Sequence, residues 1–164
     1  MKKTVIIAIF VIYLASIVVV QIFGVPVVVP PPSNVYITGI QVTGVELTNP
    51  QDGQDTTVEA TEQTTAEGKK YMLYAFKFVP GEYTKDEESL QNNPNRVKIN
   101  YILQPDDANK DFLNIIITGD EEHFHYIKET DEIVFLKKRL RLEITLSESQ
   151  ANLDVQDYIV IRSK

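Results

Sequence analysis

The chain begins with one long apolar run, which differs from everything that follows it. Residues 4–24, TVIIAIFVIYLASIVVVQIFG, carry no charge. About 20 apolar residues in a helix cover the roughly 30 Å hydrocarbon core of a bilayer. A cleaved secretory signal has a shorter apolar core, of about 7 to 15 residues, and a cleavage site between small residues. The run therefore predicts an uncleaved transmembrane helix over residues 4–24.

The flanks of this run predict its orientation. Lys2 and Lys3 precede it, and the first charged residue beyond it is Glu46. Because positive residues next to a span stay in the cytoplasm, residues 1–3 should be a cytoplasmic stub and the rest of the chain should lie outside. Residues 25–34 contain four prolines, which favour an extended, polyproline-like stalk. We therefore expect a single-pass protein of the cell membrane with an extracytoplasmic domain at residues 35–164.

Within this domain, apolar and polar residues alternate in short stretches. The clearest case has Val97, Ile99, Tyr101 and Leu103 on one side, and residues 139–146 repeat the pattern. Alternation with period two predicts half-buried strands, and strands about ten residues apart with no long helix are typical of an antiparallel β-sandwich. The fold class is therefore all-β, with about seven or eight strands after one transmembrane helix. The expected strands cover residues 34–48, 70–79, 96–103, 112–118, 123–128, 133–136, 139–146 and 155–162.

Three stretches of the domain depart from this simple alternation. In residues 34–48 the apolar side changes at Gly39 and again at Gly44, which indicates two bulges or a strand that crosses between two sheets. Residues 49–70 are almost entirely polar and are expected to form a long loop. Residues 84–90 predict a short helix with Thr84 as its N-cap and Glu87 completing a capping box.

Charge and cysteine content narrow the partners and the compartment. The chain has 23 acidic and 16 basic residues, a net charge of −7, and no cysteine. Two of the basic residues belong to the stub, so the domain is more acidic still, and such a surface repels nucleic acid. Without disulfides the domain depends on its hydrophobic core alone, as exported bacterial domains often do. We therefore expect no nucleic-acid partner and an extracytoplasmic bacterial domain.

Candidate chemistry is confined to a few polar clusters. His123 and His125 form an H-x-H pair that could direct both imidazoles to one face of a strand, as a zinc site requires. The remaining ligands are unspecified, and a solvated strand face accounts for both histidines equally well. The acidic turn at residues 106–111 lacks the glycine and the closing glutamate of a calcium loop, and no G-x-S-x-G motif is present. We predict no catalytic, cofactor or metal site, and whether His123 and His125 bind a metal stays open.

Three short motifs resemble a known family of domains. Residues 103–110, LQPDDANK, form a corner with proline, alanine, asparagine and lysine after a strand, and residues 133–137 and 157–161 carry alternating aliphatics. Together they resemble bacterial immunoglobulin-like domains of group 2, the intimin and invasin type, over roughly residues 35–162. The tryptophan common in that family after the corner is absent, and the stretches 49–70 and 80–95 are longer than usual.

The resemblance implies a non-catalytic module and offers no catalytic residue to transfer. The expected function is therefore interaction, adhesion or a structural role in the cell envelope. The expected partners are the membrane and an envelope protein or polysaccharide. The alternative is an accessory single-span subunit of a larger membrane complex, in which the span itself packs on other helices.

Overall fold

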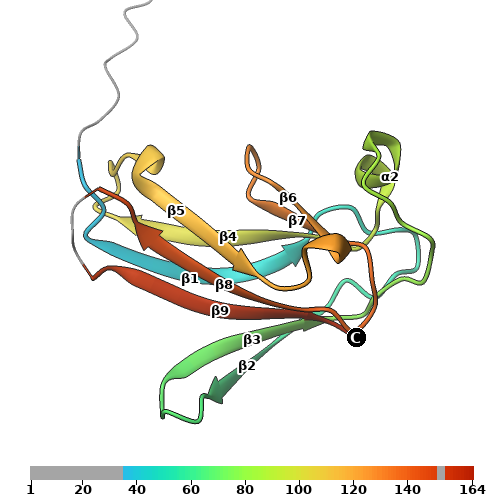
Figure 1. Ribbon diagram of the computed structural model, residues 1–164, viewed down its shortest axis with the longest axis horizontal. Coiled ribbons are helices and arrows are strands. Elements are labelled where there is room, and N and C mark those ends of the chain that lie inside the picture. The colour runs from blue at the N-terminus through green and yellow to red at the C-terminus, as the bar shows by residue number, and fades with distance from the viewer. Residues whose placement is uncertain (1–34, 151–153) are drawn as a thin grey trace, which may run out of the picture. The chain divides into compact units, whose positions relative to one another are not determined.

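Two β-sheets make up the part of the chain that the computed structural model describes, residues 35–150 and 154–164 (Figure 1). Strands account for 49% and helices for 9% of these residues, which confirms the all-β prediction. One sheet has the order β1-β4-β7-β6 and the other the order β2-β3-β9-β8-β5. The strands are β1 Gly39–Leu47, β2 Val58–Thr64, β3 Lys70–Phe76, β4 Arg96–Gln104, β5 Leu113–Thr118, β6 Phe124–Ile127, β7 Glu132–Phe135, β8 Arg141–Glu148 and β9 Gln156–Ser163. The short helices are α2 Glu87–Asn92, η1 Lys110–Phe112 and η2 Glu121–His123.

Side chains from both sheets form one hydrophobic core between them. Phe76 on β3 and Phe135 on β7 are each at most 1% exposed, and their rings meet edge to face with centroids 5.1 Å apart. This geometry is favourable for aromatic pairs. Along β8, Leu142, Ile144 and Leu146 are buried at every second position. The alternation in the sequence thus identifies the face of each strand that packs against the opposite sheet.

The change of apolar side in β1 is explained by a bulge. Val42 pairs with Tyr101 and Gly44 pairs with Asn100, so Thr43 is an extra residue without a partner on β4. Successive side chains of a strand point to opposite faces, so a one-residue shift in the apolar pattern would turn the later apolar residues away from the core. The extra residue in the bulge cancels this shift. Residues on both sides of the bulge therefore face the core. The predicted bulge at Gly44 is confirmed, whereas the register from Gly39 to Val42 has no shift.

The predicted polar loop at residues 49–70 is wrong in its second half, because β2 lies there. This strand pairs antiparallel with β3 along its whole length, from Val58 opposite Phe76 to Thr64 opposite Lys70. Most of its side chains are exposed. An edge strand with solvent on nearly every side chain is held by backbone hydrogen bonds, so it needs no apolar alternation in its sequence. This strand brings the number in the described residues to nine rather than seven or eight.

The short helix begins two residues later than expected. Its N-cap is Asp86 rather than Thr84, and the Asp86 carboxylate accepts a hydrogen bond from the Ser89 backbone N–H at 2.9 Å. Aspartate is among the most favourable N-cap residues because its side chain satisfies a free N–H of the first turn.

The predicted stub at 1–3, transmembrane helix at 4–24 and stalk at 25–34 lie outside the described residues. Within residues 35–150 and 154–164, no helix is long and apolar enough to span a membrane.

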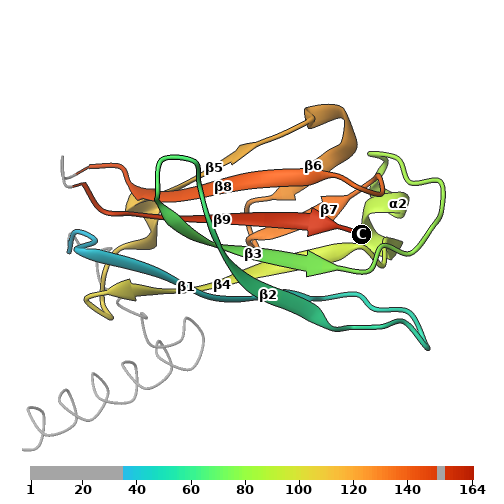
Figure 2. The same cartoon turned by 90° about the horizontal axis from the view of Figure 1, so that it is seen from below.

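The last strand of the chain, β9, lies in the middle of the five-stranded sheet, between β3 and β8 (Figure 2). It pairs antiparallel with β8 but parallel with β3, so the sandwich is not purely antiparallel as expected. Ile159, Val160 and Ile161 are at most 1% exposed. Three consecutive buried residues indicate a strand covered on both faces.

Two buried asparagines connect the two sheets near one end. Asn95, immediately before β4, accepts a hydrogen bond from the Val79 N–H at 2.7 Å and donates one to the Val79 carbonyl at 3.0 Å. Asn93 donates to the Phe135 carbonyl at 3.1 Å, and its own side-chain oxygen accepts from the Asn95 N–H at 2.8 Å. Both asparagines are fully buried. They therefore satisfy backbone groups of the segment after β3 and of β7.

Replacing Asn95 should destabilise the domain strongly. Asn95→Ala leaves the Val79 N–H without its partner, whereas the Val79 carbonyl keeps the Tyr83 hydroxyl at 3.2 Å. A buried group left unsatisfied costs about 1–3 kcal/mol, so we expect the free energy of unfolding to fall by about 1–3 kcal/mol in urea titrations of the full-length chain. The matched control is Asn114→Ala on the exposed face of β5, which should change it by less than about 0.5 kcal/mol. Equal effects at the two positions would contradict this role.

A partly buried ion pair joins the start of β4 to β7. Arg96 donates two hydrogen bonds to the Glu132 carboxylate, and the Thr130 hydroxyl donates another at 2.5 Å. Glu132 is only 7% exposed. Burial alone would raise the pKa of Glu132, but the hydrogen bonds from Thr130, Arg96 and Thr48 together hold this pKa below its usual range.

This depressed pKa predicts a loss of stability in acid. The ionised form contributes stability above the ordinary glutamate pKa of about 4.3, and this stability is lost as the pH falls through the lower pKa of the folded state. Glu132→Gln should therefore be less stable than the wild type at pH 7, with a gap that narrows below about pH 4. Chemical denaturation at a series of pH values measures the gap. Glu67→Gln, on an exposed turn, should follow the wild type at every pH.

Candidate functional site

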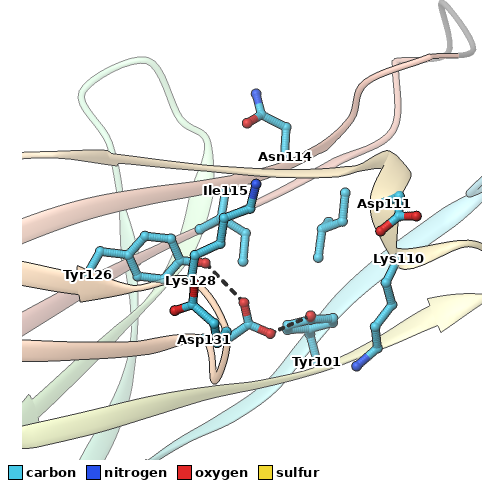
Figure 3. A pocket seen from close by; sticks show the side chains of 10 residues that line it. Tyr101, Lys110, Asp111, Asn114, Ile115, Tyr126, Lys128 and Asp131 are labelled. Carbon is cyan, nitrogen blue, oxygen red and sulfur yellow. Dashed lines mark hydrogen bonds between the residues drawn. The ribbon is translucent and has the colours of Figure 1, made fainter.

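A cavity of about 360 Å³ lies between the two sheets (Figure 3). On this side, β6 is the edge strand of the four-stranded sheet and β5 is the edge strand of the five-stranded sheet. One wall comes from β5 and η1, with Ile115 and Lys110. The other comes from β4 and from the hairpin of β6 and β7, with Tyr101, Tyr126 and Asp131. The cavity is therefore built by residues of both sheets.

Two tyrosines share one carboxylate in this cavity. The Tyr101 hydroxyl donates to Oδ2 of Asp131 at 2.7 Å, and the Tyr126 hydroxyl donates to Oδ1 at 3.0 Å. Figure 3 shows the two hydroxyls directed at Asp131 from different strands. Asp131 has a φ of 56°, and its carbonyl accepts a hydrogen bond from the Ile99 N–H at 3.2 Å. The Tyr101–Asp131–Tyr126 triad therefore fixes the turn between β6 and β7 against β4.

The triad keeps both phenols protonated. Burial raises the pKa of Tyr101 and of Tyr126 well above the ordinary value of about 10, and the hydrogen bond to Asp131 and its negative charge raise both further. At neutral pH the tyrosines are therefore hydrogen-bond donors, and both carboxylate oxygens of Asp131 are occupied. This arrangement joins the two phenols and Asp131 into one hydrogen-bonded wall of the cavity.

Charges of both signs surround the triad. Lys110 holds its ammonium 5.6 Å from the centre of the Tyr101 ring, within the range of a cation–π contact. Lys128 also lines the cavity, together with Asp111 and Glu129. Long, flexible side chains of both signs can donate and accept hydrogen bonds at the same time. The cavity thus suits a polar chain with donors and acceptors, such as a peptide or a saccharide, better than an ion of one sign.

A second cavity adjoins the first along the same side of the sandwich. It has a volume of about 330 Å³ and shares Ile115 and Tyr126 with the first. Ile117, Phe124 and His125 extend its lining toward the other end of β5. We call the two cavities together the β5/β6 groove. The groove is partly apolar and follows the edge strand β5.

The structure separates the two histidines that the sequence placed on one strand. His123 ends η2, and its Nδ1 atom lies 2.8 Å from Asp120, which is the N-cap of that helix. His125 lies on β6 and lines the groove instead. Asp120, Glu122 and His123 bring one ligand atom each within 4.8 Å of one another. These three groups are partly or fully exposed, and the contact of Asp120 with His123 accounts for their proximity without a metal.

Two other polar clusters occupy turns. Asn109 is the N-cap of η1 and accepts from the Asp111 N–H at 3.0 Å, so the acidic stretch 106–111 is a turn as expected. A basic run lies in the β7–β8 turn, where Lys137, Lys138 and Arg139 are exposed. Arg139 has a φ of 62° in this turn. Asp111, at the end of the acidic stretch, lines the first cavity, whereas the basic run lines neither of the two cavities.

Comparisons with protein-family models, with curated proteins and with solved structures find no match for this chain. The site therefore has to be interpreted from its own geometry. The residues that define it, Tyr101, Tyr126 and Asp131, were not identified as site residues from the sequence. The sequence pattern predicted Tyr101 only as an inward-facing residue of its strand.

Removing the charge of Asp131 should lower the pH at which the two tyrosines ionise. Asp131→Asn keeps a residue that tolerates positive φ but removes the negative charge that opposes phenolate formation. We expect the late tyrosine titration, followed by the ultraviolet absorbance of phenolate, to move down toward pH 10. Asp111→Asn, on the opposite wall of the cavity, should leave this titration in place.

The same tyrosines predict a loss of stability in alkali. Because the folded state raises both pKa values, the stability that depends on them is complete below about pH 10 and is lost as the pH rises above it. This loss should be smaller in Asp131→Asn than in the wild type. Denaturation measured above and below pH 10 would contradict the triad if both proteins lost stability equally.

Proposed function

We propose that this chain is a non-catalytic interaction module of the bacterial cell envelope, anchored in the membrane by residues 4–24. In this proposal residues 35–164 form an immunoglobulin-like domain outside the cytoplasm. The domain binds an envelope protein or polysaccharide through the β5/β6 groove. The observation that carries the proposal is the groove itself, a partly apolar opening between the sheets with charges of both signs at one end.

The chemistry of the groove favours binding over catalysis. Each oxygen of Asp131 accepts a hydrogen bond from a protonated phenol, and these bonds hold the carboxylate in a structural role. Lys110 and Lys128 stand beside it as donors, and Asp111 and Glu129 as acceptors. Such groups recognise the amides of a peptide or the hydroxyls of a sugar. Apolar Ile115 and Ile117 supply contact area along the same path.

The arrangement of the corner at residues 103–110 supports the immunoglobulin-like assignment. After β4, the Ala108 N–H donates to the Pro105 carbonyl at 2.9 Å, and the Asn109 N–H donates to the Val35 carbonyl at 3.0 Å. Tyr36 and Phe112 stack with centroids 5.3 Å apart. These contacts fix the chain where it leaves one sheet and enters the other at β5. The motif that suggested the family thus occurs at a connection between sheets, as an immunoglobulin-like sandwich requires.

The binding test uses paired charge reversals in the full-length chain. The double variant Lys110→Glu, Lys128→Glu should lose most of its binding to envelope components, because reversal replaces the donors with acceptors and makes the groove acidic. The assay compares the components that co-purify with each chain from solubilised membranes, identified by mass spectrometry, and the sugars bound on a glycan array. The matched control is Lys137→Glu, Lys138→Glu in the exposed β7–β8 turn, which should bind as the wild type does. Equal loss in both variants, or binding unchanged in the groove variant, would count against the proposal.

The alternative is an accessory single-span subunit of a larger membrane complex. Exchanging residues 4–24 for an unrelated transmembrane helix separates the two. A module that acts through the groove keeps its envelope partners after the exchange, whereas a subunit that packs through its span loses them. The wide spacing of small residues in the run favours the first outcome.

A further inference from the structure

The edge strand β5 is unprotected in a way that the other long edges are not. Its six residues, Leu113–Thr118, carry no charge, and among the described strands it pairs only with β8. Ile116 is 50% exposed at its middle. By contrast, the opposite edge of the same sheet, β2, carries Glu59 and Glu62. Charged side chains on an edge discourage pairing with another strand, and an apolar, uncharged edge invites it.

We propose that β5 pairs antiparallel with β5 of a second copy of this chain, which joins two five-stranded sheets into one continuous sheet. This inference rests on the proposed use of the β5/β6 groove as an interaction surface and names a second copy as an occupant of its edge. Two copies of one edge strand related by a two-fold axis pair antiparallel, and the interface then closes without leaving a free site.

The sequence of β5 selects the register of this pairing. A two-fold axis perpendicular to an antiparallel pair places one residue opposite its own counterpart, and directly opposite residues point to the same face. With Ile116 on the axis, Ile115 lies opposite Ile117 of the second copy, and Asn114 lies opposite Thr118 of the second copy. Each pair then joins residues of the same kind. The isoleucines at 115 and 117 pair on the inner face, and on the outer face the polar residues 114 and 118 pair on either side of the two Ile116 side chains.

The charges beyond the ends of β5 agree with this direction. Asp120, Glu121 and Glu122 follow the strand, whereas Lys110 and Lys128 lie near its start, beside Asp111 and Glu129. Antiparallel pairing brings the acidic end of one copy to the end of the other copy that holds both lysines. Parallel pairing would instead place three carboxylates against three carboxylates. Opposite charges across an interface favour the first arrangement and oppose the second.

The added strand would also lengthen the groove. Ile115 and Ile117 point inward from β5 and line it. In this register the second copy's Ile115 and Ile117 face the same side, next to those residues. Apolar side chains of the second strand thus extend the apolar lining of the groove, which then continues from one copy to the other.

Disulfide trapping at the axis tests the pairing in the full-length chain. The chain has no cysteine, so Ile116→Cys introduces a single thiol. Opposite residues in an antiparallel pair have Cα atoms about 4.5–5.5 Å apart, and a disulfide needs roughly 4.4–6.8 Å. Oxidation of membranes with copper–phenanthroline should therefore give covalent dimer on a non-reducing gel.

The matched control is Ile102→Cys, because Ile102 on β4 is also 50% exposed. We expect at least about tenfold more covalent dimer at position 116 than at position 102, since pairing raises the effective concentration of the two introduced thiols at the axis. Asn114→Cys should crosslink less than Ile116→Cys, because residue 114 faces Thr118 of the second copy. Equal crosslinking at 102 and 116, or none at 116, overturns the proposal.

A second measurement does not depend on a cysteine variant. The mass of the detergent-solubilised full-length chain, measured by analytical ultracentrifugation, should fall from dimer to monomer in Ile116→Lys, which places two lysines opposite each other. Ile102→Lys should leave it unchanged. If the chain is monomeric but the lysine reversals at 110 and 128 still abolish envelope binding, the proposed function stands and self-pairing is wrong. If the dimer forms but no envelope component binds, the proposed function is wrong and self-pairing stands.

Discussion

The central position of β9 is the constraint on which the rest of the domain depends. This strand is the last in the chain, yet it lies between β3 and β8 and joins the two halves of the five-stranded sheet. Its parallel pairing with β3, Met72 opposite Ile159, connects residues far apart in sequence, and ordering such a long intervening chain costs conformational entropy. Among the described strands β8 alone pairs with β5, and β8 pairs with β9 on its other side, so β9 connects the strand that supplies one wall of the groove to the rest of the sheet.

The sequence predicts the strands that have one buried face and misses the one that does not. In β4 and β8 a core residue alternates with a partly or fully exposed one over most of the strand, so period two is visible in the sequence itself. In β2, Val58 and Gln63 alone are partly buried, and the strand exists because β3 offers an unpaired edge with a matching register. Backbone hydrogen bonds carry no sequence signature. Polar composition therefore predicted a loop where pairing with β3 produces a strand.

The site could not be found from local patterns because its parts are brought together by the fold. Tyr101 lies on β4. Asp131 lies 30 positions later, just before β7, and no sequence motif predicted its positive φ. The histidine pair showed the opposite problem. Its spacing suggested a shared strand face, but Asp120 caps a short helix that includes His123 and leaves only His125 on β6. Spacing predicts a common face only where both residues belong to the same element.

The protection of the edges explains why one side of the sandwich is open. Lys164 pairs with Glu59 and Lys70 with Glu62 on β2, so that edge is charged and solvated. On β1 the bulge at Thr43 interrupts the ladder, and Asp157 accepts from the Val42 N–H at 2.7 Å, which ties this edge to the opposite sheet. Both devices oppose the addition of another strand. On the other side, β6 is only four residues long and β5 has no charge at all, so the sandwich leaves unpaired backbone and apolar side chains together there. The groove and the unprotected strand β5 thus have the same cause, because this side of the sandwich lacks a feature that opposes pairing with another strand.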